Sequence, residues 1–296
     1  AAVPLVGVAD VRPAALFADN MIIQRETQAP VWGRADAGEK VTVTGSWGKS
    51  VKATTADDGK WMVKLKTPEA GGPHTITIKG DNTVEIKNVL AGEVWFCSGQ
   101  SNMDFILNQL VKFKVGRTAP QDQPAAEYIK IEVATAKDDL LRQFTVQKNT
   151  SPLEPLDTFM GAWMISSPKT NADFSATAYF FGRELRKELN VPVALIKCAW
   201  GGTRVEPWMP AEEFQQDEEM AAYYDANIAA LKGKIAKWDP TKVEANYQAA
   251  LKKWQGTKKG RKPRKASHPK GNQQSPSTLF NGMVSPVIPY AIKGAI

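Results

Sequence analysis

The chain of 296 residues contains only two cysteines and two histidines. Two cysteines do not make the disulfide framework of a small secreted domain. Cys97 and Cys198 each lie in an apolar run, VWFC and VALIKC, so we expect buried free thiols, with a bridge between neighbouring strand ends as the alternative. So few thiols and imidazoles argue against a protein zinc site. We therefore predict no metal and no cofactor.

Long apolar runs are also missing. None approaches the roughly 18–20 residues that span a bilayer, so we predict no membrane association. The opening AAVPLVGVADVRP has neither the charged start nor the long apolar stretch of a signal peptide. It matches what remains after a leader has been removed, and we expect a secreted or periplasmic protein.

Acidic residues are absent from residues 252–270, which hold nine of the Lys and Arg side chains. The net charge of +7 is therefore local, and the rest of the chain is slightly acidic. Proteins that bind single-stranded nucleic acid interleave basic with aromatic residues, but this segment contains only Trp254. We predict a solvated surface loop and no nucleic-acid partner.

Residues 1–90 have the pattern of a small β domain. Apolar and polar residues alternate in VTVTGSW, KWMVKL, HTITIK and TVEIKNV, as in half-buried strands, and turn-forming residues separate these segments. Several short strands at this spacing predict a β-sandwich-like accessory domain. His74 lies at the start of one of these strands, and we expect it to be structural.

Residues 91–296 change to strands alternating with helices. GEVWFC and VPVALIKCAW are continuous apolar runs, typical of parallel strands that are buried on both faces. YIKIEVAT alternates and is predicted as a further strand, whereas residues 173–190 have helical periodicity and end before Pro192. This order predicts an α/β domain with a doubly wound parallel sheet.

Residues 211–270 interrupt this pattern. Residues 211–255 are rich in Ala, Glu and Lys and are broken at Asp239-Pro240, which predicts two helices. The basic loop follows, so the segment is predicted to be a helical insertion in the α/β domain. The last six residues, AIKGAI, again have the pattern of a strand.

The sequence GQSNM at residues 99–103 directly follows the first buried strand. Ligands of open α/β sheets collect beyond the carboxyl ends of the strands, so the Ser101 hydroxyl is expected at this crevice. Backbone N–H groups at the start of the next helix can stabilise an oxyanion. The alternative is that Ser101 merely caps a helix. This is not the G-x-S-x-G elbow, because Met103 replaces the final glycine.

The sequence WGGTRVEPW at residues 200–208 follows the second buried strand. Its two glycines permit close backbone approach to a ligand, and an N–H group there can complete an oxyanion hole. Trp200 and Trp208 offer flat surfaces suited to sugar rings. The alternative is a tight turn whose tryptophans belong to the core.

Together these segments resemble a known family. GEVWFCSGQSNM, then FSATAYFFGRELRKELNVPVALIKCAWGGTRVEPW, then LFNGMVSP match, in order, the sialate O-acetylesterases, which are SGNH-type serine hydrolases with a flavodoxin-like fold. The resemblance implies removal of O-acetyl groups from sialic acid or plant polysaccharide sugars without a metal. It also implies that Ser101 is the nucleophile, that the N–H groups of Ser101 and Gly202 form the oxyanion hole, and that the pocket is lined by Gln100, Asn102, Thr203 and Arg204.

One part of the family pattern is missing. The family's Gln-Gly-Glu block and the Asp-x-x-His block, which supplies the catalytic Asp and His, do not occur in this sequence. His268 follows Ser101 in the chain, but Lys265 stands where the aspartate belongs. A serine hydroxyl without a base is a weak nucleophile. We therefore expect the chain alone to be inactive, and a C-terminal fragment or second chain to supply both groups. The alternative is a non-catalytic carbohydrate-binding protein on a degenerate hydrolase fold.

Overall fold

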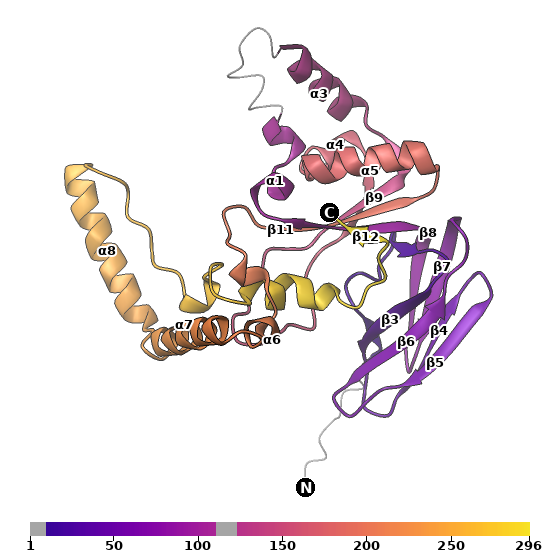
Figure 1. Ribbon diagram of the computed structural model, residues 1–296, viewed down its shortest axis with the longest axis horizontal. Helices are drawn as coiled ribbons and strands as arrows, with labels where there is room; N and C mark the ends of the chain where they lie inside the picture. Colours follow the sequence, from indigo (N-terminus) through magenta and orange to yellow (C-terminus); the bar gives the residue numbers. More distant parts are fainter. Residues whose placement is uncertain (1–9, 111–122) are drawn as a thin grey trace. The chain divides into compact units, whose positions relative to one another are not determined.

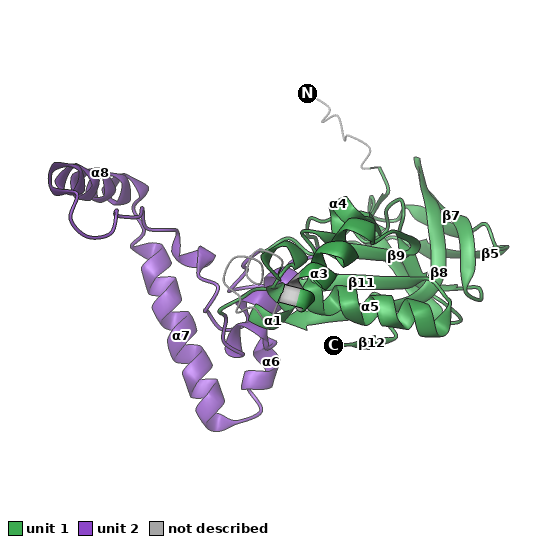
Figure 2. Ribbon diagram, turned by 90° about the horizontal axis from the view of Figure 1, so that it is seen from above, with its two compact units in different colours: residues 1–148, 158–202, 287–296 green, residues 149–157, 203–286 purple. Residues whose placement is uncertain are grey.

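The computed structural model describes residues 10–110 and 123–296. The chain forms two compact units (Figure 2): unit 1 comprises residues 1–148, 158–202 and 287–296, and unit 2 comprises residues 149–157 and 203–286. Among the described helices, none is long and apolar enough to cross a membrane.

The N-terminal strands of unit 1 form antiparallel sheets, as the alternating pattern predicts (Figure 1). One sheet has the order β1-β3-β6, the other contains β4, β5, β7 and the first half of β8, and β2 pairs with β8 in parallel. Buried Trp61, Val63 and Leu65 alternate with exposed residues in β6. The bounds are β1 (Arg12–Pro13), β2 (Ile22–Gln24), β3 (Gln28–Arg34), β4 (Lys40–Gly45), β5 (Lys49–Thr54), β6 (Lys60–Lys66), β7 (Gly71–Lys79) and β8 (Thr83–Gly99).

Strand β8 belongs to both parts of unit 1. Its first half pairs with β7, and its second half pairs in parallel with β11. The predicted domain boundary after residue 90 falls inside this 17-residue strand. The division into residues 1–90 and 91–296 therefore stays a prediction, and β8 is the element that joins the two predicted parts.

The second half of unit 1 is an α/β arrangement, which confirms the predicted fold class. Strands β9, β11 and β8 are parallel neighbours, β10 pairs antiparallel with β9, and β12 pairs in parallel with β8. The described helices of this half lie along one face of the sheet (Figure 1). The bounds are α1 (Ser101–Asp104), α3 (Gln123–Thr135), β9 (Asp138–Thr145), β10 (Trp163–Ser166), α4 (Pro168–Asn171), α5 (Ala176–Leu189), β11 (Val193–Ala199) and β12 (Gly294–Ala295).

One predicted strand was wrong. YIKIEVAT lies in helix α3, and the next strand of the sheet is β9, whose sequence DDLLRQFT drew no prediction. Alternation over eight residues does not separate the two periods, because Ile129 and Val133 also lie one helical turn apart. Pro124 in the first helical turn is the signal that favoured a helix. Strand β9 was missed because it buries the polar side chains of Arg142 and Gln143.

Unit 2 is mainly helical and confirms the two helices joined at Asp239-Pro240. The Asp239 carboxylate accepts hydrogen bonds from the backbone N–H groups of Thr241 and Lys242 and so caps α8. The predicted loop 252–270 was wrong in its first part, because α8 continues to Thr257. The bounds are η2 (Glu206–Trp208), α6 (Ala211–Phe214), α7 (Glu218–Ala236), α8 (Pro240–Thr257), η3 (Pro269–Gly271), η4 (Phe280–Val284) and η5 (Ser285–Val287).

Both cysteines are buried free thiols, which decides between the two alternatives. Cys97 lies in β8 and Cys198 in β11, and their neighbours across the two strands are Lys197 and Ser98. Burial raises the pKa of Cys97 to about 12 and also raises the pKa of Cys198. Both side chains therefore act as small apolar core residues.

Candidate active site

The two sequence motifs meet because their strands are parallel neighbours. Strands β8 and β11 pair in register from Val193 opposite Glu93 to Ala199 opposite Gly99. The N–H of Trp200 also donates to the carbonyl oxygen of Gly99 at 3.1 Å. The GQSNM and WGG turns therefore leave the sheet at the same edge and at the same level.

Ser101 begins the short helix α1, immediately after the strand. Gly99 has φ +143°, a backbone conformation that favours glycine, and it turns the chain out of the strand. Gln100 is the N-cap, and its side-chain oxygen accepts the N–H of Ser101 at 2.8 Å. Ser101 is exposed, so its hydroxyl is accessible from solvent.

Three donors converge on one oxygen atom at this turn. The Gln100 Oε1 atom accepts hydrogen bonds from the N–H of Ser101 at 2.8 Å, from the N–H of Gly202 at 3.1 Å and from the Ser101 hydroxyl. An oxyanion hole is defined by such donors aimed at the position where the oxyanion forms. The Gln100 amide oxygen therefore lies on the two N–H groups that the family resemblance assigns to the oxyanion hole, and this role of the N–H groups stays a prediction.

Gly202 is a position where only glycine fits easily. Its φ is +77°, in the left-handed region, and a Cβ built there meets no atom within 4 Å. Backbone conformation rather than crowding therefore requires glycine. Gly201 is different, since its Cβ would lie 3.4 Å from Asp104 Oδ2 and 3.6 Å from Ser101 Cα, which are ordinary contacts.

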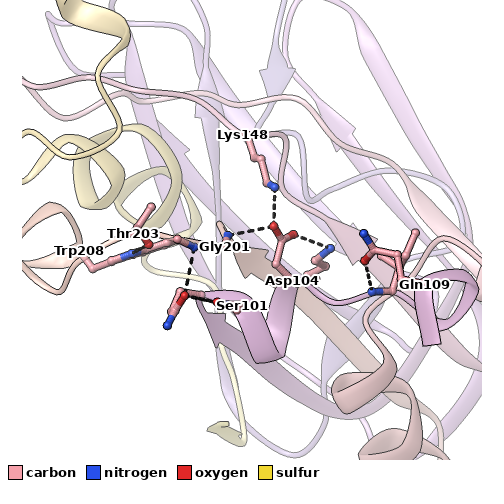
Figure 3. A network of polar contacts seen from close by, with 11 residues as sticks. Ser101, Asp104, Gln109, Lys148, Gly201, Thr203 and Trp208 are labelled. Carbon is pink, nitrogen blue, oxygen red and sulfur yellow. Dashed lines mark hydrogen bonds and ion pairs between the residues drawn. The ribbon is translucent and has the colours of Figure 1, made fainter. Parts of the chain in front are cut away.

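A carboxylate that sequence reasoning missed lies beside these donors (Figure 3). Asp104 Oδ2 accepts the N–H of Gly201 at 2.9 Å and lies 2.5 Å from the Lys148 ammonium, while Oδ1 lies 3.1 Å from Lys197 Nζ. Burial alone would raise the pKa of Asp104, but the bonds from Lys148, Gly201 and Lys197 lower it below its ordinary value. Lys197 was the available signal, because it interrupts an otherwise apolar buried strand.

The other predicted pocket residues are divided between the units. Asn102 is exposed beside Ser101, and its carbonyl oxygen accepts the Thr177 hydroxyl at 3.0 Å. Thr203 and Arg204 follow Gly202 in the chain but belong to unit 2. There the Thr203 hydroxyl accepts the Trp208 indole N–H at 2.9 Å, and the N–H of Arg204 donates to Gln274 at 3.1 Å. Their role as pocket residues stays a prediction.

Both histidines have other partners. His74 packs edge-on against Trp47, with ring centroids 5.2 Å apart, and burial lowers its pKa. His268 Nδ1 accepts the N–H of Lys270 at 3.2 Å, and its ring packs against Trp238. Within residues 10–110 and 123–296, no imidazole is hydrogen-bonded to Ser101. In the same ranges no three His, Cys, Asp or Glu side chains gather as a metal site.

Comparison with known proteins identifies the family. A family model described as carbohydrate esterase, sialic acid-specific acetylesterase, matches residues 91–266. The sialate O-acetylesterases of Rattus norvegicus and Homo sapiens are each 30% identical to the chain, over 66% and 67% of its length. The matched regions are 36% and 38% of those proteins, so the chain spans well under half of either.

A solved structure agrees with this assignment. The crystal structure of a carbohydrate acetylesterase from Xanthomonas citri superposes with a TM-score of 0.66 at 27% sequence identity. The match covers 97% of this chain and 50% of that one. The chain belongs to the carbohydrate esterase family of sialic acid-specific acetylesterases.

Proposed function

We propose that this protein hydrolyses O-acetyl esters of sugars, with Ser101 as the nucleophile. The observation that carries the proposal is the convergence of the N–H groups of Ser101 and Gly202, together with the Ser101 hydroxyl, on one oxygen position. Acyl transfer needs a nucleophile and oxyanion donors within reach of a single carbonyl group. Membership of a carbohydrate esterase family supports acetylated sugars as the substrate class.

The proposed reaction uses this geometry together with a general base. A base removes the proton of Ser101 Oγ as that oxygen forms a bond to the acetyl carbonyl carbon. The carbonyl oxygen displaces the Gln100 amide oxygen, becomes an oxyanion and accepts hydrogen bonds from the N–H groups of Ser101 and Gly202. The bond from carbon to the sugar oxygen then breaks, and the sugar leaves with the proton. Water repeats the cycle on the acetyl-serine and releases acetate.

The base and its aspartate are proposed to come from polypeptide outside these 296 residues, either a C-terminal fragment or a second chain. Two observations support this. The two histidines of the chain are held by other partners within the structure. The family members that match are also longer, since the matched regions are 36–38% of the curated relatives. Intact mass analysis of active protein should reveal this additional polypeptide, and activity in the 296-residue chain alone would contradict the proposal.

The sugar itself is proposed only as a class. Two of the relatives are named sialate O-acetylesterases and one is a carbohydrate acetylesterase. We propose acetylated sialic acid and acetylated plant polysaccharide sugars, such as xylan fragments, as the substrates to compare. Export from the cytoplasm stays a prediction, and fractionation of the source cells tests it.

The test is Ser101→Ala in the intact protein. Release of p-nitrophenol from p-nitrophenyl acetate, and of acetate from acetylated sialic acid and acetylated xylan fragments, should fall by about 10³-fold or more, because no nucleophile remains. Ser98→Ala, three residues earlier and in strand β8, is the matched control and should keep parental activity. Activity of Ser101→Ala within about tenfold of the parent would refute the assignment.

The second candidate is a non-catalytic carbohydrate-binding protein. The absence of an imidazole bonded to Ser101 in the described residues favours it. Trp200 would then serve as a sugar-binding surface, although the Lys148 ammonium lies 5.6 Å from its ring centroid. Binding of acetylated sugar by the intact protein without any release of acetate would support this candidate and exclude the esterase.

A further inference from the structure

One carboxylate links the ends of three neighbouring strands. Asp104 is in helix α1, which follows β8. Lys197 is the third residue from the end of β11, and Lys148 follows β9. The two ammonium groups lie 3.1 Å and 2.5 Å from the carboxylate oxygens of Asp104. The third partner is not a charge but the backbone N–H of Gly201, at 2.9 Å from Oδ2.

Burial makes this link obligatory. Only 7% of the Lys197 side chain and 18% of the Asp104 side chain are exposed, and every residue of β11 is buried. A buried ammonium without a partner carries a large desolvation cost, so Lys197 requires the Asp104 carboxylate. The three bonds that the carboxylate accepts favour its ionised form in turn.

The N–H group that Asp104 holds is one residue before a proposed oxyanion donor. Gly201 donates to Asp104, and the following residue, Gly202, donates to the oxygen position beside Ser101. Fixing the Gly201 N–H restricts the rotation of the turn that presents the Gly202 N–H. Asp104 also shares its four-residue helix with Ser101. The nucleophile and the anchor of the opposite turn therefore move together.

We propose that Asp104 is a positioning residue of the oxyanion hole, with Lys197 as the buried charge that keeps it in place. The proposal rests on the proposed esterase function. The Asp104 carboxylate is bonded to Lys148, Lys197 and the Gly201 N–H, whereas the Ser101 hydroxyl is bonded to Gln100, so Asp104 acts through other groups. Its carboxylate holds the Gly201–Gly202 turn so that the Gly202 N–H is already aimed before the oxyanion forms, and this preorganisation is what makes such donors effective.

The experiment compares Asp104→Ala with the double variant Asp104→Ala/Lys197→Met in the intact protein. The single variant removes the anchor and leaves a buried, unpaired ammonium. The double variant removes both, and Met has nearly the length of the Lys stem. Thermal stability should therefore fall in the single variant and recover in the double variant. Asp104→Leu, which has nearly the same shape and also lacks an acceptor for the Gly201 N–H, provides the same comparison if Asp104→Ala does not fold.

Catalysis should not recover with stability. In the double variant, kcat on p-nitrophenyl acetate should stay 10–100-fold below the parent while KM changes by less than about threefold, because the loss is in transition-state stabilisation. Hydrogen–deuterium exchange of the segment 199–204 should also be faster than in the parent. A double variant with kcat within threefold of the parent, or with unchanged exchange in this segment, would overturn the proposal.

The Ser101→Ala variant separates the two hypotheses. If Ser101→Ala is inactive and the double variant keeps parental kcat, the positioning role is wrong and the esterase proposal stands. If Ser101→Ala stays active, the esterase proposal fails. The exchange measurement then still reports on the link between Asp104 and Gly201, because it requires no turnover.

Discussion

Replacement of Gly202 by alanine tests the oxyanion hole with a single methyl group. The N–H of Gly202 donates at 3.1 Å to the oxygen of Gln100, which lies at the proposed oxyanion position. The added Cβ meets no atom within 4 Å, so it causes no steric clash. Its effect comes from φ +77°, which alanine disfavours. Gly202→Ala therefore changes the backbone preference without filling space.

Two magnitudes decide the expected loss. A left-handed conformation costs an L-residue about 1–2 kcal/mol. Losing one oxyanion donor costs about 2.7–4 kcal/mol in the transition state. We expect the backbone of the free variant to relax out of the left-handed conformation. Because strain is the smaller of the two costs, the variant returns to that conformation in the transition state, with the N–H in place and the backbone strained. The cost of about 1–2 kcal/mol corresponds to a loss of roughly 5–30-fold in kcat/KM.

Gly201→Ala is the matched control for this experiment. Its Cβ would make ordinary contacts of 3.4 Å with Asp104 Oδ2 and 3.6 Å with Ser101 Cα. We expect a loss of about threefold or less in kcat/KM for p-nitrophenyl acetate, with thermal unfolding followed for both variants. If Gly201→Ala loses as much activity as Gly202→Ala, or if Gly202→Ala matches the parent, the assignment of the Gly202 N–H is wrong.

Two further predictions concern the neighbours of Ser101. Gln100→Ala should not lower kcat/KM for p-nitrophenyl acetate, because the small ester no longer displaces the amide oxygen that fills the oxyanion position; a tenfold fall would show that Gln100 binds the reacting ester. The pKa of Asp104 is lowered from its ordinary value of 3.8. Its ionised carboxylate therefore stabilises the folded state above pH 3.8, and this stabilisation is lost as the pH falls through the lower folded-state pKa. The difference in unfolding free energy between the parent and Asp104→Asn, measured with urea, should therefore shrink from pH 6 to pH 3, and a constant difference would refute the ionised pair.

Sequence patterns predicted the elements that rest on strong local signals. The buried runs of β8 and β11, the helix α5 and the break at Asp239-Pro240 all occur as expected. The patterns failed where a buried side chain is polar and is hydrogen-bonded by residues that are distant in the sequence. Strand β9 buries Arg142, which donates to the carbonyl oxygen of Met21 and to Asn88, and burial lowers its pKa to about 10. No local pattern reveals partners that lie more than 50 residues away.

The same limit applies to the site. The resemblance to the sialate O-acetylesterases led to Ser101 and Gly202, and the structure places both in turns that follow neighbouring buried strands, while their catalytic roles stay predictions. Asp104 could not be predicted, since its role depends on Lys148, Lys197 and the Gly201 N–H, which come from other strand ends. Gln100 was predicted to line the pocket. In the structure its amide oxygen accepts hydrogen bonds from the N–H groups of Ser101 and Gly202. The backbone angles decide which side-chain atom faces which donor, and these angles could not be predicted from the sequence.

The register of β11 on β8 connects the site to the fold. A strand whose residues are all buried and mostly apolar specifies its register weakly, because a shift by one residue still buries apolar side chains on both faces. Lys197 removes this freedom, since a one-residue shift would turn its ammonium to the face opposite Asp104, where the charge would be buried without that partner. The same shift would separate Ala199 from Gly99 and carry the Gly202 N–H away from Ser101. The buried ion pair therefore favours the register in which the N–H groups of Ser101 and Gly202, the proposed oxyanion donors, meet.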